Sequence, residues 1–266
     1  MNGVRFWRGL KKERDDDMSR FFVEDRNIIE DEILIDNEQD IHHIARVLRL
    51  KPGALIDVSD SREWEYHGQI ISLSPDKIKV KILDKQKFAR EPNLRVTLFQ
   101  GIPKQGKMEG IIQKSVELGA ASIVPVFMTR TITSEKGNIE KKVARWQKVA
   151  GEAVKQCKRG IIPQIDKAIS FEAMLEWLTS EASGYELIVF PYENEEEHTI
   201  KQALRALQMI PKQAAVIIGP EGGFSDEEAE ALKEIGSKCV SLGKAILRTE
   251  TAGPTAIAMI MYELEL

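Results

Sequence analysis

The stretch AAVIIGPEGGFSDEEAEAL, residues 214–232, decides the fold class of this chain. Its apolar half ends in Gly219-Pro220-Glu221-Gly222-Gly223, and a helical pattern begins immediately afterwards. Ser225 and Glu228 have the S-x-x-E spacing of a capping box, which fixes the start of that helix. A strand that runs through a glycine-rich turn into a helix is typical of an open α/β sheet, where ligands bind at the carboxyl ends of the strands.

The glycines of this turn have two interpretations that local chemistry leaves open. Bare backbone can lie against a flat ligand such as adenine, or a tight turn can simply need a residue with positive φ. The pattern is neither G-x-G-x-x-G nor G-x-x-x-x-G-K-[ST], so it disfavours a dinucleotide fold and a P-loop NTPase.

The alternation of strands and helices extends outward from this turn. The sequence predicts strands at residues 94–100, 122–127, 185–190, 214–219 and 239–242. It predicts helices at 107–119 and 139–158, after the glycine-rich turn, and at the C-terminus. Units of this length indicate an α/β fold, a mostly parallel sheet with helices on both faces.

Upstream, residues 20–83 contain short β-favouring runs separated by turn signals, with one helix expected at 39–50. This pattern predicts a small β-barrel of a kind often used on RNA. The polar, proline-containing segment 84–93 resembles an interdomain linker.

We therefore expect three parts. Residues 1–17 form an N-terminal extension, because Met18 opens the first strand-like stretch. Residues 18–88 form the β-barrel, and residues 89–266 form the α/β domain.

Composition narrows the class of protein. No run approaches the ~18 apolar residues of a membrane span, and the N-terminus has no secretory signal pattern. The two cysteines, Cys157 and Cys239, lie far apart, as expected of unpaired thiols in a reducing, cytoplasmic compartment. None of the four histidines has metal-ligand spacing, so no metal is expected.

The net charge and the distribution of charge give different indications of whether the protein binds nucleic acid. The net charge of −4 argues weakly against a phosphate-binding partner. Its distribution is uneven, however, because residues 139–160 hold seven basic and two acidic side chains. Taken by itself, this basic stretch fits a solvated helix face at least as well as an RNA contact.

A second informative segment is SLGKAILRTETAGPTAIAMIMYEL, residues 241–264. Arg248, Thr249 and Glu250 lie where its closing helix begins. Thr249 or Thr251 can cap the helix and Glu250 suits the helix dipole, which would make the segment an ordinary N-terminus. Arg248 fits this interpretation poorly, because a cation at the positive end of a helix is misplaced unless it serves a ligand.

Four separated motifs carry a resemblance to a known family. IGPEGGFS, LGKAILRTETA, GIPKQGKMEGIIQKSVELG and HHIARVLRLKPG together resemble the bacterial small-subunit rRNA uridine-N3 methyltransferases of the SPOUT superfamily. The resemblance runs in order from about Met18 to the C-terminus. It implies a trefoil-knotted α/β domain, an N-terminal PUA-like RNA-binding barrel, a homodimer and S-adenosylmethionine as cofactor. The implied reaction is methylation of N3 of a specific uridine in 16S ribosomal RNA of the small subunit.

The resemblance also assigns residues to the cofactor. Its motifs place the cofactor in three loops: Phe190 and Pro191; Gly219, Pro220, Glu221, Gly222 and Gly223; Leu242, Gly243, Ile246, Leu247 and Arg248. One departure stands out, since this chain has Ala245 where the family often has an arginine or another bulky residue.

Uridine N3 methylation suggests roles for the RTE segment. The imide proton must leave, and negative charge builds on O2 and O4 of the base. Arg248 is the expected donor to these oxygens, with the Thr249 hydroxyl as a helper. Glu250 and Glu221 are candidate proton acceptors, although a carboxylate beside the sulfonium would stabilise the ground state more than the transition state. We therefore expect both glutamates mainly to hold backbone or ribose.

RNA contacts are expected from basic residues in both domains. They are Arg20, Arg46, Arg49, Lys104, Lys107, Lys114, Arg145 and Lys148. Each one taken singly also fits a solvated surface charge.

The closing helix carries Ile257, Ile260, Met261 and Leu264 on one face, which suits either a homodimer or burial against its own sheet.

Two alternatives to the favoured function remain. One is a SPOUT enzyme acting on another RNA or position. The other is a non-catalytic RNA-binding assembly factor, which intact cofactor loops disfavour.

Overall fold

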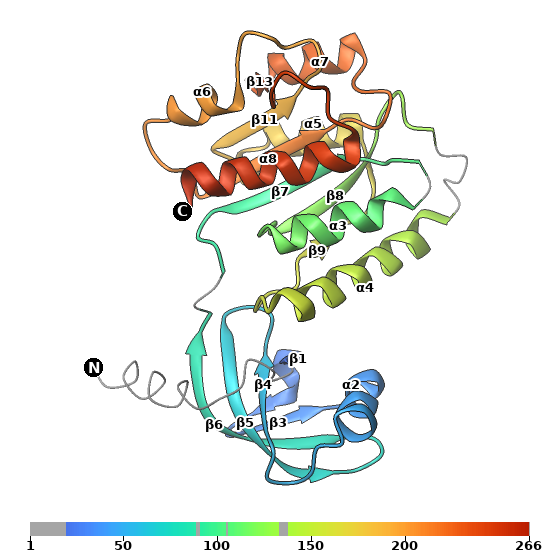
Figure 1. Ribbon diagram of the computed structural model, residues 1–266, viewed down its shortest axis with the longest axis vertical. Helices are drawn as coiled ribbons and strands as arrows, with labels where there is room; N and C mark the ends of the chain where they lie inside the picture. The colour runs from blue at the N-terminus through green and yellow to red at the C-terminus, as the bar shows by residue number, and fades with distance from the viewer. Residues whose placement is uncertain (1–19, 89–90, 105, 133–137, 266) are drawn as a thin grey trace. The chain divides into compact units, whose positions relative to one another are not determined.

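The computed structural model describes residues 20–88, 91–104, 106–132 and 138–265. The chain divides into two compact units, Met1–Ala89 and Arg90–Leu266, each with a hydrophobic core of its own (Figure 1). The extension expected at residues 1–17 lies outside the described residues.

The N-terminal unit is a curled six-stranded sheet. Its strands follow the order β1 (Arg20–Phe22), β4 (Leu55–Ser59), β5 (Trp64–Leu73), β6 (Ile78–Lys87), β3 (Glu32–Ile35) and β2 (Ile28–Ile29). Only β1 and β4 pair in parallel, and the other neighbours are antiparallel. Ile33, Val58, Ile70 and Val80 are completely buried in the core that the sheet encloses. The predicted β-rich unit is confirmed.

The helix of this unit is shorter than the sequence predicts. It begins as α2 (Glu38–His42), where the Asn37 side chain accepts the N–H groups of Gln39 and Asp40 at 3.0 and 3.1 Å. It continues as a π-helical turn, η3 (His43–Val47), and ends before Arg49, whose φ of 53° is incompatible with a right-handed helix. A short 3₁₀ turn, η2 (Asp25–Asn27), completes the unit.

The segment predicted as a linker, residues 84–93, is a strand in its first part. β6 continues to Lys87, which lies opposite Trp64 of β5. The ammonium groups of Lys85 and Lys87 lie 4.6 and 5.5 Å from the centre of the Trp64 ring. The polar composition therefore reflects a solvent-facing strand, because an antiparallel sheet needs apolar residues on one face only.

The C-terminal unit is built on a parallel sheet. The strand order is β10 (Ile169–Ser170), β8 (Ser122–Phe127), β7 (Arg95–Gly101), β12 (Gln213–Ile218), β11 (Leu187–Pro191) and β13 (Lys238–Val240). A further strand, β9 (Gln164–Ile165), pairs with β8. Every pairing in this sheet is parallel, so the carboxyl ends of the strands lie along one edge.

Helices cover both faces of this sheet, as predicted (Figure 1). On one face, α5 (Phe171–Thr179) and α7 (Asp226–Glu234) pack on a core that includes Phe99, Ile217 and Phe224. On the other, α8 (Thr249–Leu264) packs against β7, β12 and α3 (Lys107–Glu117), and α3 packs against α4 (Ile139–Cys157). The remaining helices are α6 (Ile200–Arg205), which contacts α8, and the 3₁₀ turn η5 (Glu181–Ser183).

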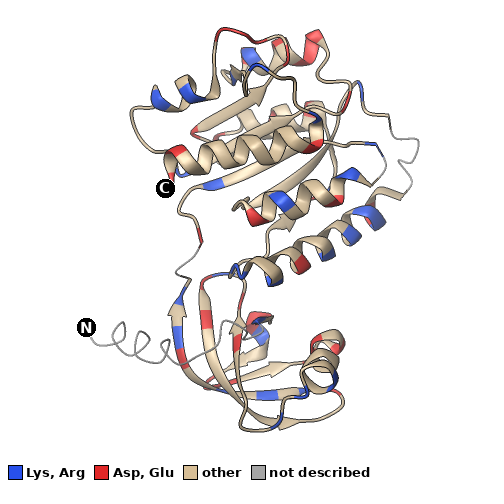
Figure 2. Ribbon diagram, in the orientation of Figure 1, with Lys and Arg blue, Asp and Glu red and all other residues tan. Residues whose placement is uncertain are grey.

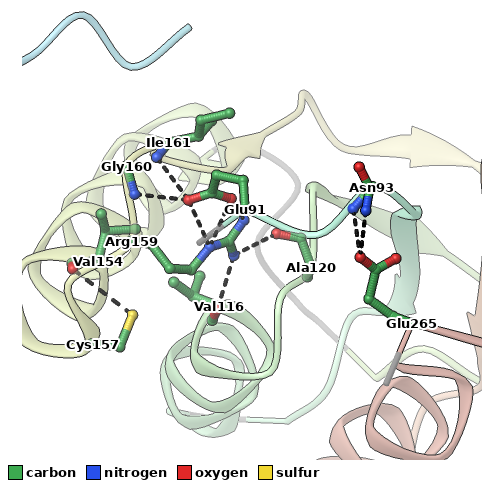
Figure 3. Close-up of polar contacts among 10 residues, drawn as sticks. All are labelled: Glu91, Asn93, Val116, Ala120, Val154, Cys157, Arg159, Gly160, Ile161 and Glu265. Atoms are coloured by element: carbon green, nitrogen blue, oxygen red, sulfur yellow. Dashed lines mark hydrogen bonds and ion pairs between the residues drawn. The ribbon is translucent and has the colours of Figure 1, made fainter. Parts of the chain in front are cut away.

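Two carboxylates hold the segment that leads into β7 (Figure 3). Glu91 accepts hydrogen bonds from Arg159 Nη2 at 2.7 Å and from the N–H groups of Gly160 and Ile161 at 2.7 and 3.1 Å. Arg159 is 7% exposed and also donates to carbonyls at the end of α3. Glu265 accepts the N–H of Asn93 at 2.8 Å. The basic stretch 139–160 thus ends in a buried structural arginine.

We expect Arg159→Met to lower the free energy of unfolding of the C-terminal unit by about 3 kcal/mol, because it leaves the buried Glu91 carboxylate without its cation. The control is Arg205→Met, which breaks an exposed pair with Glu263 and should cost at most about 1 kcal/mol. Urea unfolding followed by tryptophan fluorescence measures both, with Trp146 of α4 as the reporter. Equal losses in the two variants would contradict the structural role of Arg159.

Candidate functional site

The three loops expected to hold the cofactor follow neighbouring strands. Val189 of β11 lies opposite Val216 of β12, and Pro191 lies opposite Val240 of β13. Since these strands are parallel, the residues that follow β11, β12 and β13 emerge at the same edge of the sheet. The tertiary structure therefore brings together segments that are separated by up to about fifty residues in sequence.

The turn after β12 is tight because of its glycines. The N–H of Gly223 donates to the carbonyl of Pro220 at 2.9 Å, and Gly223 has a φ of 68°. A β-carbon on Gly219 would lie 3.0 Å from the carbonyl carbon of Gly223. The positive-φ interpretation therefore holds at Gly223, and it is compatible with a ligand against the same backbone. The predicted capping box is also present, with Ser225 and Glu228 bonded reciprocally.

The loop after β8 braces this turn from one side. Arg130 Nη1 donates to the carbonyl of Gly222 at 2.8 Å, and the N–H of Thr129 donates to the buried carboxylate of Glu228 at 2.7 Å. The sequence offered no signal for Arg130, because a single arginine after a strand resembles any surface charge.

Thr249 braces the turn from the opposite side. It is 5% exposed, and its hydroxyl donates to the carbonyl of Gly219 at 2.7 Å. Gln100, at the end of β7 and fully buried, donates to the same hydroxyl at 2.9 Å. The N-cap position of α8 is occupied by Arg248, whose side chain makes no capping hydrogen bond. Neither Thr249 nor Thr251 therefore caps this helix. Gln100 was not predicted, since one amide in an apolar strand gives no pattern.

A lysine joins the two glutamates of the site. Lys107 Nζ, at the start of α3, lies 3.0 Å from Glu221 Oε1 and 3.2 Å from Glu250 Oε2. Glu221 also accepts the N–H of Lys104 at 3.0 Å. The loop after β7, the turn after β12 and the start of α8 are therefore tied together by one cluster of charges.

These contacts set the protonation of the carboxylates. Burial by itself would raise the pKa of Glu221, but hydrogen bonds from its own N–H, from Lys107 and from the Lys104 N–H outweigh it and lower the pKa. The pKa of Glu250 is lowered mainly by its own backbone N–H, with Lys107 adding to the effect. The hydrogen bond to Glu221 raises the pKa of Lys107. Both carboxylates are therefore charged and weakly basic at neutral pH, which suits a bracing role better than proton abstraction.

Arg248 is in a different situation. Its side chain is exposed, and in the described part of the chain no hydrogen bond or ion pair joins its guanidinium to another residue. Its neighbour Ile246 is 81% exposed and Ala245 is exposed as well. Arg248 interacts electrostatically with Glu250 but forms no hydrogen bond or ion pair in the described residues, so its guanidinium at the positive end of α8 can serve a ligand.

The structure divides the residues expected to contact RNA. Six of them have exposed side chains: Arg46, Arg49, Lys104, Lys114, Arg145 and Lys148. Three of the eight form ion pairs: Arg20 with Glu65, Lys107 with the two glutamates of the site, and the exposed Arg145 with Glu109 at 2.8 Å. Figure 2 shows basic residues repeated along α4, the helix with Arg145 and Lys148. Trp146 of the same helix is buried and packs in the core.

The described residues were also compared with the requirements of a metal site and of a membrane-spanning helix. Among the residues that the structure describes, no group of three or more His, Cys, Asp or Glu side chains is placed to hold a metal ion. Within the same residues, no helix is both long and apolar enough to cross a membrane. Cys157 and Cys239 are both free.

Comparisons with known proteins agree with this architecture. Residues 90–261 match the family model of an RNA methyltransferase domain, and residues 35–83 match that of an RNA methyltransferase PUA domain. Ribosomal RNA small subunit methyltransferase E of Bacillus subtilis (strain 168) is 32% identical, over 94% of this chain and 98% of the relative.

Two solved structures are similar over nearly the whole chain. Ribosomal RNA small subunit methyltransferase E from Neisseria gonorrhoeae, bound to S-adenosyl methionine, is 28% identical with a TM-score of 0.78, covering 92% of this chain and 98% of that one. A methyltransferase from Legionella pneumophila with bound SAM is also 28% identical, with a TM-score of 0.79 and the same coverage.

We expect Lys107→Met to weaken binding of S-adenosylhomocysteine by roughly tenfold, because the turn after β12 and the start of α8 lose their common cation. Isothermal titration calorimetry measures the affinity. Lys114→Met, which removes an exposed lysine from the same helix, is the matched control and should bind like the wild type. Unchanged affinity in Lys107→Met would show that the cluster does not shape the cofactor loops.

Proposed function

The chain belongs to the bacterial family of ribosomal RNA small subunit methyltransferases E, and we propose that it methylates N3 of a specific uridine in 16S ribosomal RNA. It is an S-adenosylmethionine-dependent RNA methyltransferase with a SPOUT-type α/β sheet and a PUA-like unit. The observation that carries the proposal is the exposed guanidinium of Arg248, which no described residue binds by a hydrogen bond or ion pair, at the start of a helix that braces a glycine turn at the carboxyl edge of a parallel sheet.

The residues of this edge fit the cofactor. The glycines expose backbone donors and acceptors that side chains would cover, and the cationic cofactor meets a site with several carboxylates. We propose that it is held by Phe190 and Pro191, by Gly219, Pro220, Glu221, Gly222 and Gly223, and by Leu242, Gly243, Ile246, Leu247 and Arg248. When bound, it supplies an electrophilic methyl group.

Arg248 stabilises the uracil as its N3 proton leaves. Negative charge then spreads over O2 and O4, and the planar guanidinium can donate two hydrogen bonds to oxygens of this kind. The Thr249 hydroxyl is committed to Gly219, so it holds Arg248 in place by fixing the start of α8. Glu250 and Glu221 hold Lys107, and the proton passes to solvent at the exposed side of the site. This arrangement lets positioning supply much of the acceleration.

The RNA is bound by exposed basic residues of both units. Support comes from the exposure of Arg46, Arg49, Lys114, Arg145 and Lys148, since phosphate contacts need accessible cations. Arg20 and Lys107 contribute only through the ion pairs that they make.

A protein with a ribosomal RNA substrate and unpaired cysteines is suited to the cytoplasm, where we propose that it acts.

We further propose a homodimer, formed by the face of α8 that carries Met259 and Tyr262. Ile257, Ile260 and Met261 are buried within their own unit, so this face packs against the sheet and not against a second chain. The free face of α8 carries Met259 and Tyr262, and Tyr262 is 72% exposed. An aromatic side chain left in water on an otherwise packed helix is typical of an interface.

The rate of methyl transfer should fall by roughly a hundredfold or more in Arg248→Ala, because one donor to the developing oxyanion is lost. Arg248→Lys should recover little of the rate, because an ammonium keeps the charge but not the planar fork. RNA affinity should change far less, since many phosphate contacts share it. Single-turnover kinetics at saturating cofactor and RNA measure the rate, and mass mapping of the methylated nucleotide identifies the position.

These measurements separate catalysis from bracing. A normal rate in Arg248→Ala, or lost cofactor affinity that lysine restores, would make Arg248 a structural residue. Methylation at another nucleotide or another base position would overturn the proposed substrate while leaving the methyltransferase activity intact.

Tyr262→Glu should convert the dimer to a monomer, because it places a charge in an apolar contact. Multi-angle light scattering at micromolar concentration measures the mass. The control is Tyr192→Phe, which alters a tyrosine away from α8. A wild-type mass equal to that of one chain would refute the dimer.

A further inference from the structure

Glu193, in the acidic loop after β11, lies directly against the glycine turn. Its Oε2 is 3.1 Å from the position that a β-carbon on Gly223 would occupy. Any side chain at position 223 would therefore meet this carboxylate. β11 is the neighbour of both β12 and β13, so Glu193 emerges between the two other loops of the site.

Glu193 differs from the other carboxylates near the turn because no residue in the described part of the chain binds it. Glu221 and Glu250 are held by Lys107, and Glu228 accepts the N–H groups of Ser225 and Thr129. Asp226 of α7 lies 3.3 Å from the Tyr192 hydroxyl. Within the described residues, by contrast, no hydrogen bond or ion pair reaches the carboxylate of Glu193.

The carboxylate of Glu193 is exposed and is therefore free to accept hydrogen bonds from a ligand. The cofactor offers three groups that attract a carboxylate: the ribose hydroxyls, the α-ammonium and the sulfonium. A carboxylate at the sulfonium would oppose methyl transfer, because the positive charge on sulfur disappears in the transition state. The two oxygens of a carboxylate match a vicinal diol, and acidic side chains near glycine-rich turns bind ribose hydroxyls in dinucleotide sites.

We propose that Glu193 binds the ribose hydroxyls of the cofactor's adenosine. The inference rests on the cofactor site proposed above and adds a side chain that no sequence motif singled out. Glu193 closes the site over Gly223, whose missing side chain allows the carboxylate to approach. It thereby selects for an intact ribose on the ligand.

Calorimetry on Glu193→Gln tests this assignment with two ligands. S-adenosylhomocysteine contains the ribose and the amino acid, whereas 5′-methylthioadenosine contains the ribose alone. Loss of a charge-assisted pair of hydrogen bonds should weaken both ligands by the same factor, roughly tenfold to a hundredfold. Glu196→Gln removes the same charge from the same loop and should bind both ligands like the wild type. Thermal unfolding of each variant should match the wild type, because both side chains are exposed.

The outcomes separate this inference from the proposed function. Failure of the wild type to bind S-adenosylhomocysteine would overturn the cofactor site itself. Normal wild-type binding with unchanged affinity in Glu193→Gln would overturn the role of Glu193 alone. Weakening of S-adenosylhomocysteine without weakening of methylthioadenosine would move the carboxylate to the α-ammonium and overturn the ribose assignment.

Discussion

The hydrogen bond from the Thr249 hydroxyl to the carbonyl of Gly219 joins the glycine turn to the last helix. Gln100 holds the same hydroxyl from β7, so three neighbouring parts of the unit meet at one buried oxygen. A single bond of this kind contributes only about 1 kcal/mol. Its importance is geometric, because it fixes the backbone of the turn relative to Arg248, the residue just before the helix.

A second set of contacts distributes charge around this hydrogen bond. Lys107 neutralises Glu221 and Glu250, and Arg130 holds the carbonyl of Gly222. These contacts engage the charged side chains of Lys107, Glu221, Glu250 and Arg130 with partners inside the protein. Within the described residues, Arg248 and Glu193 make no hydrogen bond or ion pair, and we propose that each meets a ligand of the opposite character. A guanidinium meets an electron-rich base, while a carboxylate meets hydroxyl donors.

A charged side chain is also paired inside the protein at a position away from the site. The buried Arg159 pairs with the partly buried Glu91 at the entry to β7, although Arg159 belongs by sequence to the most basic stretch of the chain (Figure 3). Charge runs therefore do not translate directly into a binding surface. In α4, Lys148 is exposed, whereas Trp146 of the same helix is buried in the core.

Local patterns in the sequence predict most of the strands and helices and the capping box at Ser225, because periodicity and capping act between residues that are close in the chain. The sequence also predicts a tight turn at Gly223, but the positive φ of this residue is established only by the structure. The contacts of Gln100, Lys107, Arg130 and Glu193 came only with the tertiary structure. Each of these side chains acts on a segment distant in sequence, from Gln100 bonded to Thr249 to Glu193 against Gly223. A single polar residue has no period, so its partner is decided by which strands lie side by side in the sheet.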